Sequence, residues 1–64
     1  MKKWKGKDFD YLGYHIKNDL KEGIIYVYDN YGNQICKIWN INHESITEAK
    51  NRIENIVYVK RKDG

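Results

Sequence analysis

The feature that most constrains this fold is residues 23–40, in which two runs of β-branched and aromatic residues flank the pentapeptide D-N-Y-G-N. Asn and Gly tolerate positive φ, so this pentapeptide predicts a hairpin turn between two antiparallel strands. Folding the chain back at Tyr31 and Gly32 predicts six facing pairs: Asp29 with Gln34, Tyr28 with Ile35, Val27 with Cys36, Tyr26 with Lys37, Ile25 with Ile38 and Ile24 with Trp39.

This register divides the hairpin into two faces, because side chains alternate along a strand. The first face is small and aliphatic, with Ile25, Val27, Cys36 and Ile38. The second is rich in aromatic side chains, with Ile24, Tyr26, Tyr28, Ile35, Lys37 and Trp39.

A preceding strand is predicted over residues 11–17, where the pattern alternates, with residues 18–23 as the connecting turn. Closing that turn with Lys17 opposite Ile24 gives the same two faces, which predicts an antiparallel meander. It places Ile16 beside Ile25 and Tyr14 beside Val27 on the aliphatic face, and His15 beside Tyr26 and Gly13 beside Tyr28 on the aromatic face.

After Trp39 the hydrophobic period becomes helical. Ser45-Ile46-Thr47-Glu48 matches a capping box, with Ser45 as the N-cap, and predicts a helix from Ile46 to about residues 55–57. Its apolar stripe is Ile46, Ala49, Ile53, Ile56 and Val57, and this stripe is expected to cover Leu12, Tyr14, Ile16, Ile25, Val27 and Ile38. Residues 58–62 are β-prone and predict a short strand or a frayed tail.

The predicted fold is therefore a single α+β domain. It consists of a three- or four-stranded antiparallel meander over residues 10–41 and one C-terminal helix over residues 45–57, packed on one face of the sheet. Residues 1–7 form a basic arm or an edge strand, and residues 58–64 form a basic tail. Phe9, between two aspartates, is expected to pack under the sheet.

The net charge of +3 is unevenly distributed. The first seven residues carry +4 and the last five carry +2, whereas residues 8–59 hold five basic and eight acidic side chains and carry −3. Basic ends on a mildly acidic body suit an electrostatic clamp on an anionic partner. The alternative is that solvated terminal lysines only keep a small protein soluble.

One helix covers only one sheet face, so the aromatic face is predicted to be exposed, with Tyr11, His15, Lys17, Ile24, Tyr26, Tyr28, Ile35, Lys37 and Trp39. Nucleic acid could stack on it, a second copy could bury it in a homodimer, or a host protein could dock there. Alternatively, Trp4, Phe9 or the tail folds across it. The candidate binding residues are Lys2, Lys3, Lys5, Lys7, His15, Lys17, Tyr26, Tyr28, Lys37, Trp39, Lys60, Arg61 and Lys62.

Over about residues 11–57, Y-L-G-Y-H-I, the hairpin and S-I-T-E-A-K-N-R-I resemble the three-strands-then-helix pattern of the arm-binding domains of phage and transposon integrases. The pattern is also similar to the plant ethylene-response DNA-binding domain. Both families place their sheet in the DNA major groove through arginine-rich strands; here only Lys17 and Lys37 stand on those strands. With residues 2–7 as a first strand, the layout resembles the coactivator-type single-stranded-DNA-binding fold, which dimerises. Small phage-borne inhibitors of bacterial defence systems share such compact layouts.

These features predict a non-enzymatic binding module for single- or double-stranded DNA, of phage or mobile-element type and acting as a homodimer. The alternative is a phage-type, anti-CRISPR-like inhibitor that blocks a host protein by direct contact. A remote alternative is DNA nicking with Mg²⁺ held by Asp8 and Asp10 together with Asp29 or Glu22.

No cofactor, resident metal, small-molecule substrate or membrane partner is expected. The two histidines, His15 and His43, lack a metal-spaced Cys/His set. The single cysteine, Cys36, reads as a small buried hydrophobe and fits a reducing, cytoplasmic setting. No apolar run approaches the roughly 20 residues of a membrane span, and residues 1–7 lack the apolar stretch of a signal peptide.

Overall fold

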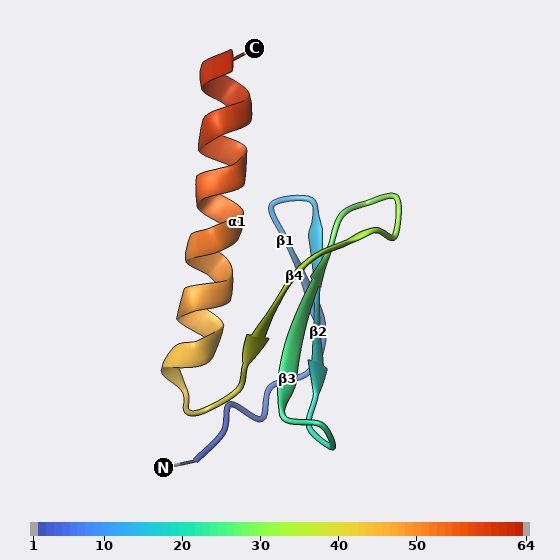
Figure 1. Cartoon of the computed structure of the whole chain (residues 1–64), viewed down its shortest axis with the longest axis vertical. Coiled ribbons are helices and arrows are strands. Elements are labelled where there is room, and N and C mark those ends of the chain that lie inside the picture. The colour runs from blue at the N-terminus through green and yellow to red at the C-terminus, as the bar shows by residue number, and fades with distance from the viewer. Residues whose placement is uncertain (1, 64) are drawn as a thin grey trace.

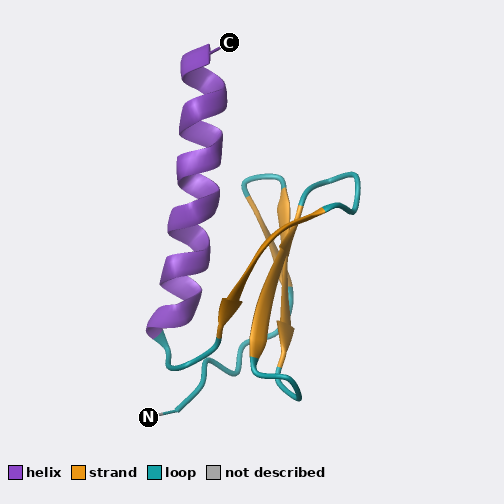
Figure 2. Ribbon diagram, in the orientation of Figure 1, coloured by secondary structure: helices purple, strands orange, loops and turns teal. Residues whose placement is uncertain are grey.

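The computed structural model describes residues 2–63, with side chains described as far as Lys60. Its elements are β1 (Phe9–Tyr11), β2 (Tyr14–Asp19), β3 (Ile24–Tyr28), β4 (Gln34–Trp39) and α1 (Glu44–Asp63). The sheet order is β1-β2-β3-β4 and each neighbouring pair is antiparallel, so the sheet is a meander. Helix α1 lies along one face of the sheet and extends beyond its end (Figures 1 and 2). The predicted α+β class, with four strands and one C-terminal helix, is confirmed.

The core lies between α1 and the aliphatic face of the sheet, as predicted. Its fully packed members are Tyr14, Ile16, Ile25, Val27, Ile38, Ala49 and Ile53. Phe9 packs against this cluster, together with Trp4 and Tyr11. The prediction that Leu12 joins the core is wrong, because this side chain lies in a turn and is 53% exposed.

The β3–β4 hairpin has the predicted register from Ile24 opposite Trp39 to Val27 opposite Cys36. Beyond that point Tyr28 pairs with Gln34, so Ile35 is the extra residue of a β-bulge and the last two predicted pairs are wrong. The cause is the turn chemistry of Asp29, whose backbone N–H donates to Asn33 O at 2.9 Å and whose Oδ1 accepts from Asn33 N at 2.9 Å. This hydrogen bond to Asn33 N holds the pKa of Asp29 below its usual value.

The β2–β3 register differs from the predicted one by two residues: Asp19, not Lys17, lies opposite Ile24. Asp19 closes a tighter turn, because its Oδ1 accepts from Glu22 N at 3.0 Å and its carbonyl accepts from Gly23 N at 2.8 Å. Gly23 has φ of +71°, a conformation that glycine adopts without strain. A shift of two residues keeps every side chain on its predicted face.

The predicted strand over residues 11–17 is two strands. A tight turn at Leu12 and Gly13, with φ of 51° and 85°, reverses the chain between β1 and β2. Tyr11 therefore pairs with Tyr14 and faces the helix, so its predicted place on the aromatic face is wrong. The first strand is β1 itself, and residues 2–8 form an arm without regular secondary structure rather than an edge strand.

The helix begins earlier and ends later than predicted. Asn42 Oδ1 accepts from Glu44 N at 2.8 Å, while Ser45 Oγ accepts from Asn42 N at 3.3 Å. The Asn42 side chain thus binds the Glu44 amide and the Ser45 side chain binds the Asn42 amide, a variant of the capping box with Asn42, not Ser45, as the N-cap. Neither Gly nor Pro interrupts the chain afterwards, so residues 58–62 continue the helix and are neither a strand nor a frayed tail.

We expect Ser45→Ala to lower the free energy of unfolding by about 1 kcal/mol, because Ser45 Oγ also accepts from Ile41 N at 3.0 Å and both amides lose their partner. Urea unfolding followed by circular dichroism measures the change. Thr47→Ala, at an exposed position of the same helix turn, is the matched control. Equal losses in the two variants would contradict the cap assignment.

Candidate nucleic-acid interface

The sheet face opposite α1, called the outer face below, carries three rows of side chains that cross the strands. The middle row is Lys17, Tyr26 and Lys37, taken from β2, β3 and β4. The row on one side of it is Asp10, His15 and Tyr28, and the row on the other side is Asp19, Ile24 and Trp39. Ile24 is buried on this face, so its predicted exposure is wrong. The six predicted site residues of the sheet, namely His15, Lys17, Tyr26, Tyr28, Lys37 and Trp39, therefore share one face.

The aromatic side chains of the outer face form a platform along β3. The Tyr26 and Tyr28 ring centroids lie 6.2 Å apart with planes inclined by 30°, and both residues are half-buried. Trp39, on the neighbouring strand, is 65% exposed. Rings held side by side with one side open to solvent offer flat apolar surfaces on which planar groups can stack.

The two lysines of the middle row flank Tyr26. Both Lys17 and Lys37 are exposed, and among the side chains described neither forms an ion pair. His15, in the next row, is engaged with the Asp10 carboxylate through its Nδ1. The two lysines thus provide unpaired positive charge on either side of an aromatic ring.

The acidic side chains of the body are divided between α1 and the sheet, where Asp10 and Asp19 lie on the outer face in the rows on either side of the lysine row. Glu44, Glu48 and Glu54 are all on α1, on the other side of the sheet. Glu54 Oε2 accepts from the Tyr11 hydroxyl at 2.5 Å, which raises the pKa of Tyr11, and Glu48 lies 3.6 Å from Arg52. Of the turn carboxylates, that of Asp8 accepts from Asn18 N at 2.7 Å. Part of the negative charge of residues 8–59 therefore lies beside the lysine row, because Asp10 and Asp19 stand in the two neighbouring rows and Asp8 lines the same hollow as Lys17.

Two asparagine side chains, Asn18 and Asn40, hold the basic arm at the end of the sheet through hydrogen bonds. Neither residue was predicted from the sequence as part of the site. Asn40, 2% exposed, accepts from Trp4 N at 2.9 Å and donates to Trp4 O at 2.8 Å. Asn18 Nδ2 donates to Trp4 O and Gly6 O, both at 3.0 Å. The only sequence signal for this contact is an asparagine in a β-prone run, and that signal does not indicate which backbone groups the asparagine side chain binds.

These bonds fix the course of the arm. The Trp4 ring packs edge-on against Phe9 with centroids 5.9 Å apart, on the core side of the sheet, so it does not cover the outer face. A Cβ at Gly6 would lie 2.2 Å from the Trp4 ring, so glycine is needed there. A Cβ added at Gly23 would lie 2.8 Å from Lys3 Nζ, so this ammonium lies over the turn between β2 and β3. Four arm residues are exposed lysines: Lys2, Lys3, Lys5 and Lys7.

Within the basic C-terminal end, the Lys60 side chain does not reach the outer face. Lys60 Nζ donates to the Tyr14 hydroxyl at 3.2 Å and lies 5.7 Å from the centroid of its ring, which places it on the helix side. The side chains of Arg61 and Lys62 lie outside the described part of the chain.

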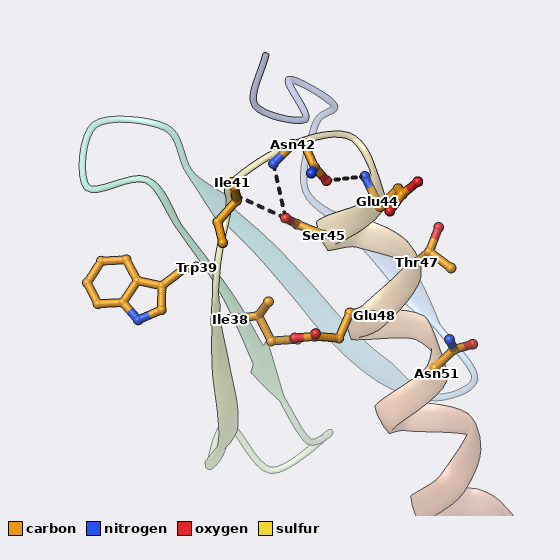
Figure 3. Close-up of a pocket in the computed structure, with 9 residues that line it drawn as sticks. All are labelled: Ile38, Trp39, Ile41, Asn42, Glu44, Ser45, Thr47, Glu48 and Asn51. Atoms are coloured by element: carbon orange, nitrogen blue, oxygen red, sulfur yellow. Dashed lines mark hydrogen bonds between the residues drawn. The ribbon is translucent and has the colours of Figure 1, made fainter. Parts of the chain in front are cut away.

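A second open region lies beside β4. Figure 3 shows this groove of about 720 Å³ between β4 and the first half of α1, with Ile38 and Glu48 pointing toward one another and Trp39 pointing away from the helix. The groove is lined by Ile38, Trp39, Ile41, Asn42, Glu44, Ser45, Thr47, Glu48 and Asn51. Cys36, on the same strand, is partly exposed rather than fully buried, and burial raises the pKa of its thiol.

Two other classes of site find no support in residues 2–60. The side chains described there contain no cluster of three or more His, Cys, Asp or Glu that could hold a metal ion. In the same part of the chain, α1 lacks the apolar length needed to cross a membrane.

Comparison with protein families, curated proteins and solved structures gives no match for this chain. What the protein binds therefore has to be inferred from the chemistry of the outer face and the arm.

Proposed function

We propose that this protein is a non-enzymatic module that binds single-stranded DNA across its outer face. The observation that carries the proposal is the row Lys17, Tyr26, Lys37, in which an aromatic ring lies between two unpaired lysines. Proteins that bind single strands combine stacking rings with positive charge that follows the phosphates. Tyr26 and Tyr28 would stack bases while the lysines neutralise the phosphates on either side.

A single strand is favoured over a duplex by the composition of the face. Reading a major groove requires side chains that reach base edges, most often arginine, and the strands carry none. Unpaired bases instead present their flat surfaces to aromatic rings. The lysines of the arm, fixed at the end of the sheet by Asn18 and Asn40, extend the positive charge beyond the outer face.

We expect Tyr26→Ala to weaken binding of a short labelled oligodeoxynucleotide by roughly 1–3 kcal/mol, about 5- to 150-fold, without changing its salt dependence. Lys17→Ala and Lys37→Ala should each reduce the slope of log affinity against log salt by about 0.7, because each removes one phosphate contact. Fluorescence anisotropy at several salt concentrations measures both effects.

Matched controls are Tyr31→Ala and Lys21→Ala, which alter an exposed tyrosine and an exposed lysine in turns outside the three rows. Losses as large as those of Tyr26→Ala and Lys17→Ala would contradict the assignment to the outer face. Preference for duplex over single strand would correct the DNA form. Failure of wild type to bind either form at low salt would overturn the proposal and favour the inhibitor class, in which an aromatic-anchored protein contact responds weakly to salt.

A further inference from the structure

Strand β4 is an open edge of the sheet. It has a strand neighbour on one side only, and the groove beside it shows that α1 does not cover it (Figure 3). Three large apolar side chains on or next to this strand are exposed: Ile35 by 40%, Trp39 by 65% and Ile41 by 61%. Open, apolar edges are surfaces on which another strand can pair.

The hydrogen-bond pattern shows which backbone groups of β4 are available. Asn40 N donates to Gly23 O at 2.9 Å, which marks these two residues as a hydrogen-bonded pair of the β3–β4 ladder. Such pairs recur at every second residue, so the amides and carbonyls of Lys37 and Trp39 point to the free edge. Of these groups, Trp39 O also accepts from Ile41 N at 3.0 Å, so an added strand would give it a second hydrogen bond. A strand added there would bond to these two residues.

A second copy of β4 can pair antiparallel across a two-fold axis in three registers that use these groups. Lys37 opposite Lys37 of the second copy sets like charges against each other, which is destabilising. With Trp39 opposite Trp39, the flanking pairs join Lys37 to Ile41, and the Ile41 amide already donates to Ser45 Oγ. Only the central Trp39 pair then has both amides free. Lys37 opposite Trp39 gives two symmetric pairs and four backbone hydrogen bonds, in two of which Trp39 O accepts a second donor beside Ile41 N.

We propose that the chain forms a homodimer through β4 in this third register, with Ile38 on the two-fold axis. Each Lys37 ammonium then lies over the Trp39 indole of the second copy, the ring type that attracts cations most strongly. The same register brings Ile41 of one copy toward Ile35 of the other. Antiparallel pairing about a two-fold axis is self-complementary, so it closes as a dimer and does not propagate.

The dimer also completes the outer face. In the merged sheet, the row Lys17, Tyr26, Lys37 of one copy continues into Trp39 of the second copy. Each copy therefore supplies the partner's row with a further stacking ring. The inference itself rests on the edge geometry and not on DNA binding.

The test compares Lys37→Pro with Lys37→Ala by sedimentation velocity over a concentration series. Proline removes an N–H that faces the free edge and leaves the β3–β4 ladder intact, whereas alanine removes only the cation–π contact. Wild type should be dimeric, Lys37→Ala dimeric with weaker affinity, and Lys37→Pro monomeric. A cooperative unfolding transition and a native-like circular dichroism spectrum for Lys37→Pro would show that proline leaves the domain folded.

A second variant covers the case in which proline unfolds the chain. Trp39→Ala should raise the dimer dissociation constant at least about tenfold, while Tyr31→Ala, at a more exposed aromatic position, should leave it unchanged. A monomeric wild type, or a folded Lys37→Pro that dimerises as well as Lys37→Ala, would overturn the inference. A dimer that binds no DNA would contradict only the proposed function. A monomer that binds DNA would contradict only the proposed dimer.

Discussion

Val27→Asp is expected to leave the chain unfolded at room temperature. Val27 has no exposed surface and lies at the centre of the sheet, between Ile16 on β2 and Cys36 on β4. A carboxylate there would have no positive partner, and an unpaired buried charge costs several kcal/mol. At 0.05–0.15 kcal/mol per residue, a chain of 64 residues has only about 3–10 kcal/mol of stability to lose.

Circular dichroism and the dispersion of amide proton shifts measure the outcome. Val27→Ala, which only leaves a small cavity, should remain folded with a loss of about 1–3 kcal/mol. Lys37→Asp introduces the same carboxylate on the outer face and should also remain folded. A well-dispersed spectrum for Val27→Asp would mean that the inner and outer faces of the sheet are reversed.

The two faces could be predicted because alternation determines them independently of the details of the turns. The β2–β3 register was displaced by two residues and yet Ile16 and Lys17 still lie on their predicted faces, since side chains repeat with a period of two. The same robustness explains why the sheet residues proposed for binding do share one surface. The prediction failed for Tyr11 because it lies beyond a turn, where the alternation restarts.

The turns and helix ends were less predictable, because they depend on single side chains. A hairpin turn with positive φ at both positions favours Asn-Gly or Asp-Gly, whereas Leu12 adopts φ of 51° here and gives no such signal. At the helix start, Asn42 Oδ1 accepts from Glu44 N and Ser45 Oγ accepts from Asn42 N, a cap that the sequence does not distinguish from one made by Ser45 and Glu48. The penalty for β-branched residues in a helix is only about 0.7 kcal/mol or less each, so residues 58–62 follow the helix before them.

Long-range amide contacts could not be predicted at all. Asn40 and Trp4 are separated by 36 positions, and the groups that meet are a side-chain amide and a backbone amide, which every residue except proline carries. No residue pattern distinguishes this pairing from others. The course of the arm, and hence the position of its four lysines, therefore emerges only from the folded structure.

Asn40→Ala is expected to lower the free energy of unfolding by about 2–4 kcal/mol. The substitution removes the acceptor of Trp4 N, one of the two donors to Trp4 O and the donor to Asn18 Oδ1, and it leaves a cavity at a position that is 2% exposed. Buried polar groups that lose their partner each cost about 1–3 kcal/mol, and relaxation of the arm toward water reduces the sum. Asn55→Ala, at an exposed helical position, is the matched control and should change stability by less than about 0.5 kcal/mol.

The same substitution separates the position of the arm from its charge. In a Trp39→Phe background Trp4 is the only tryptophan, so a red shift of its fluorescence in Asn40→Ala reports release of the arm from the core while the rest of the domain stays folded. Asn40→Ala changes no charge, so the salt slope of DNA binding should keep its value if the arm contributes only a diffuse positive field. If the arm instead holds phosphates at fixed places, affinity and salt slope should fall together. We expect this second result because four hydrogen bonds between the arm and the Asn18 and Asn40 side chains hold Trp4 and Gly6 against the sheet. An unshifted Trp4 spectrum together with unchanged unfolding would contradict the role of Asn40 as the anchor of the arm.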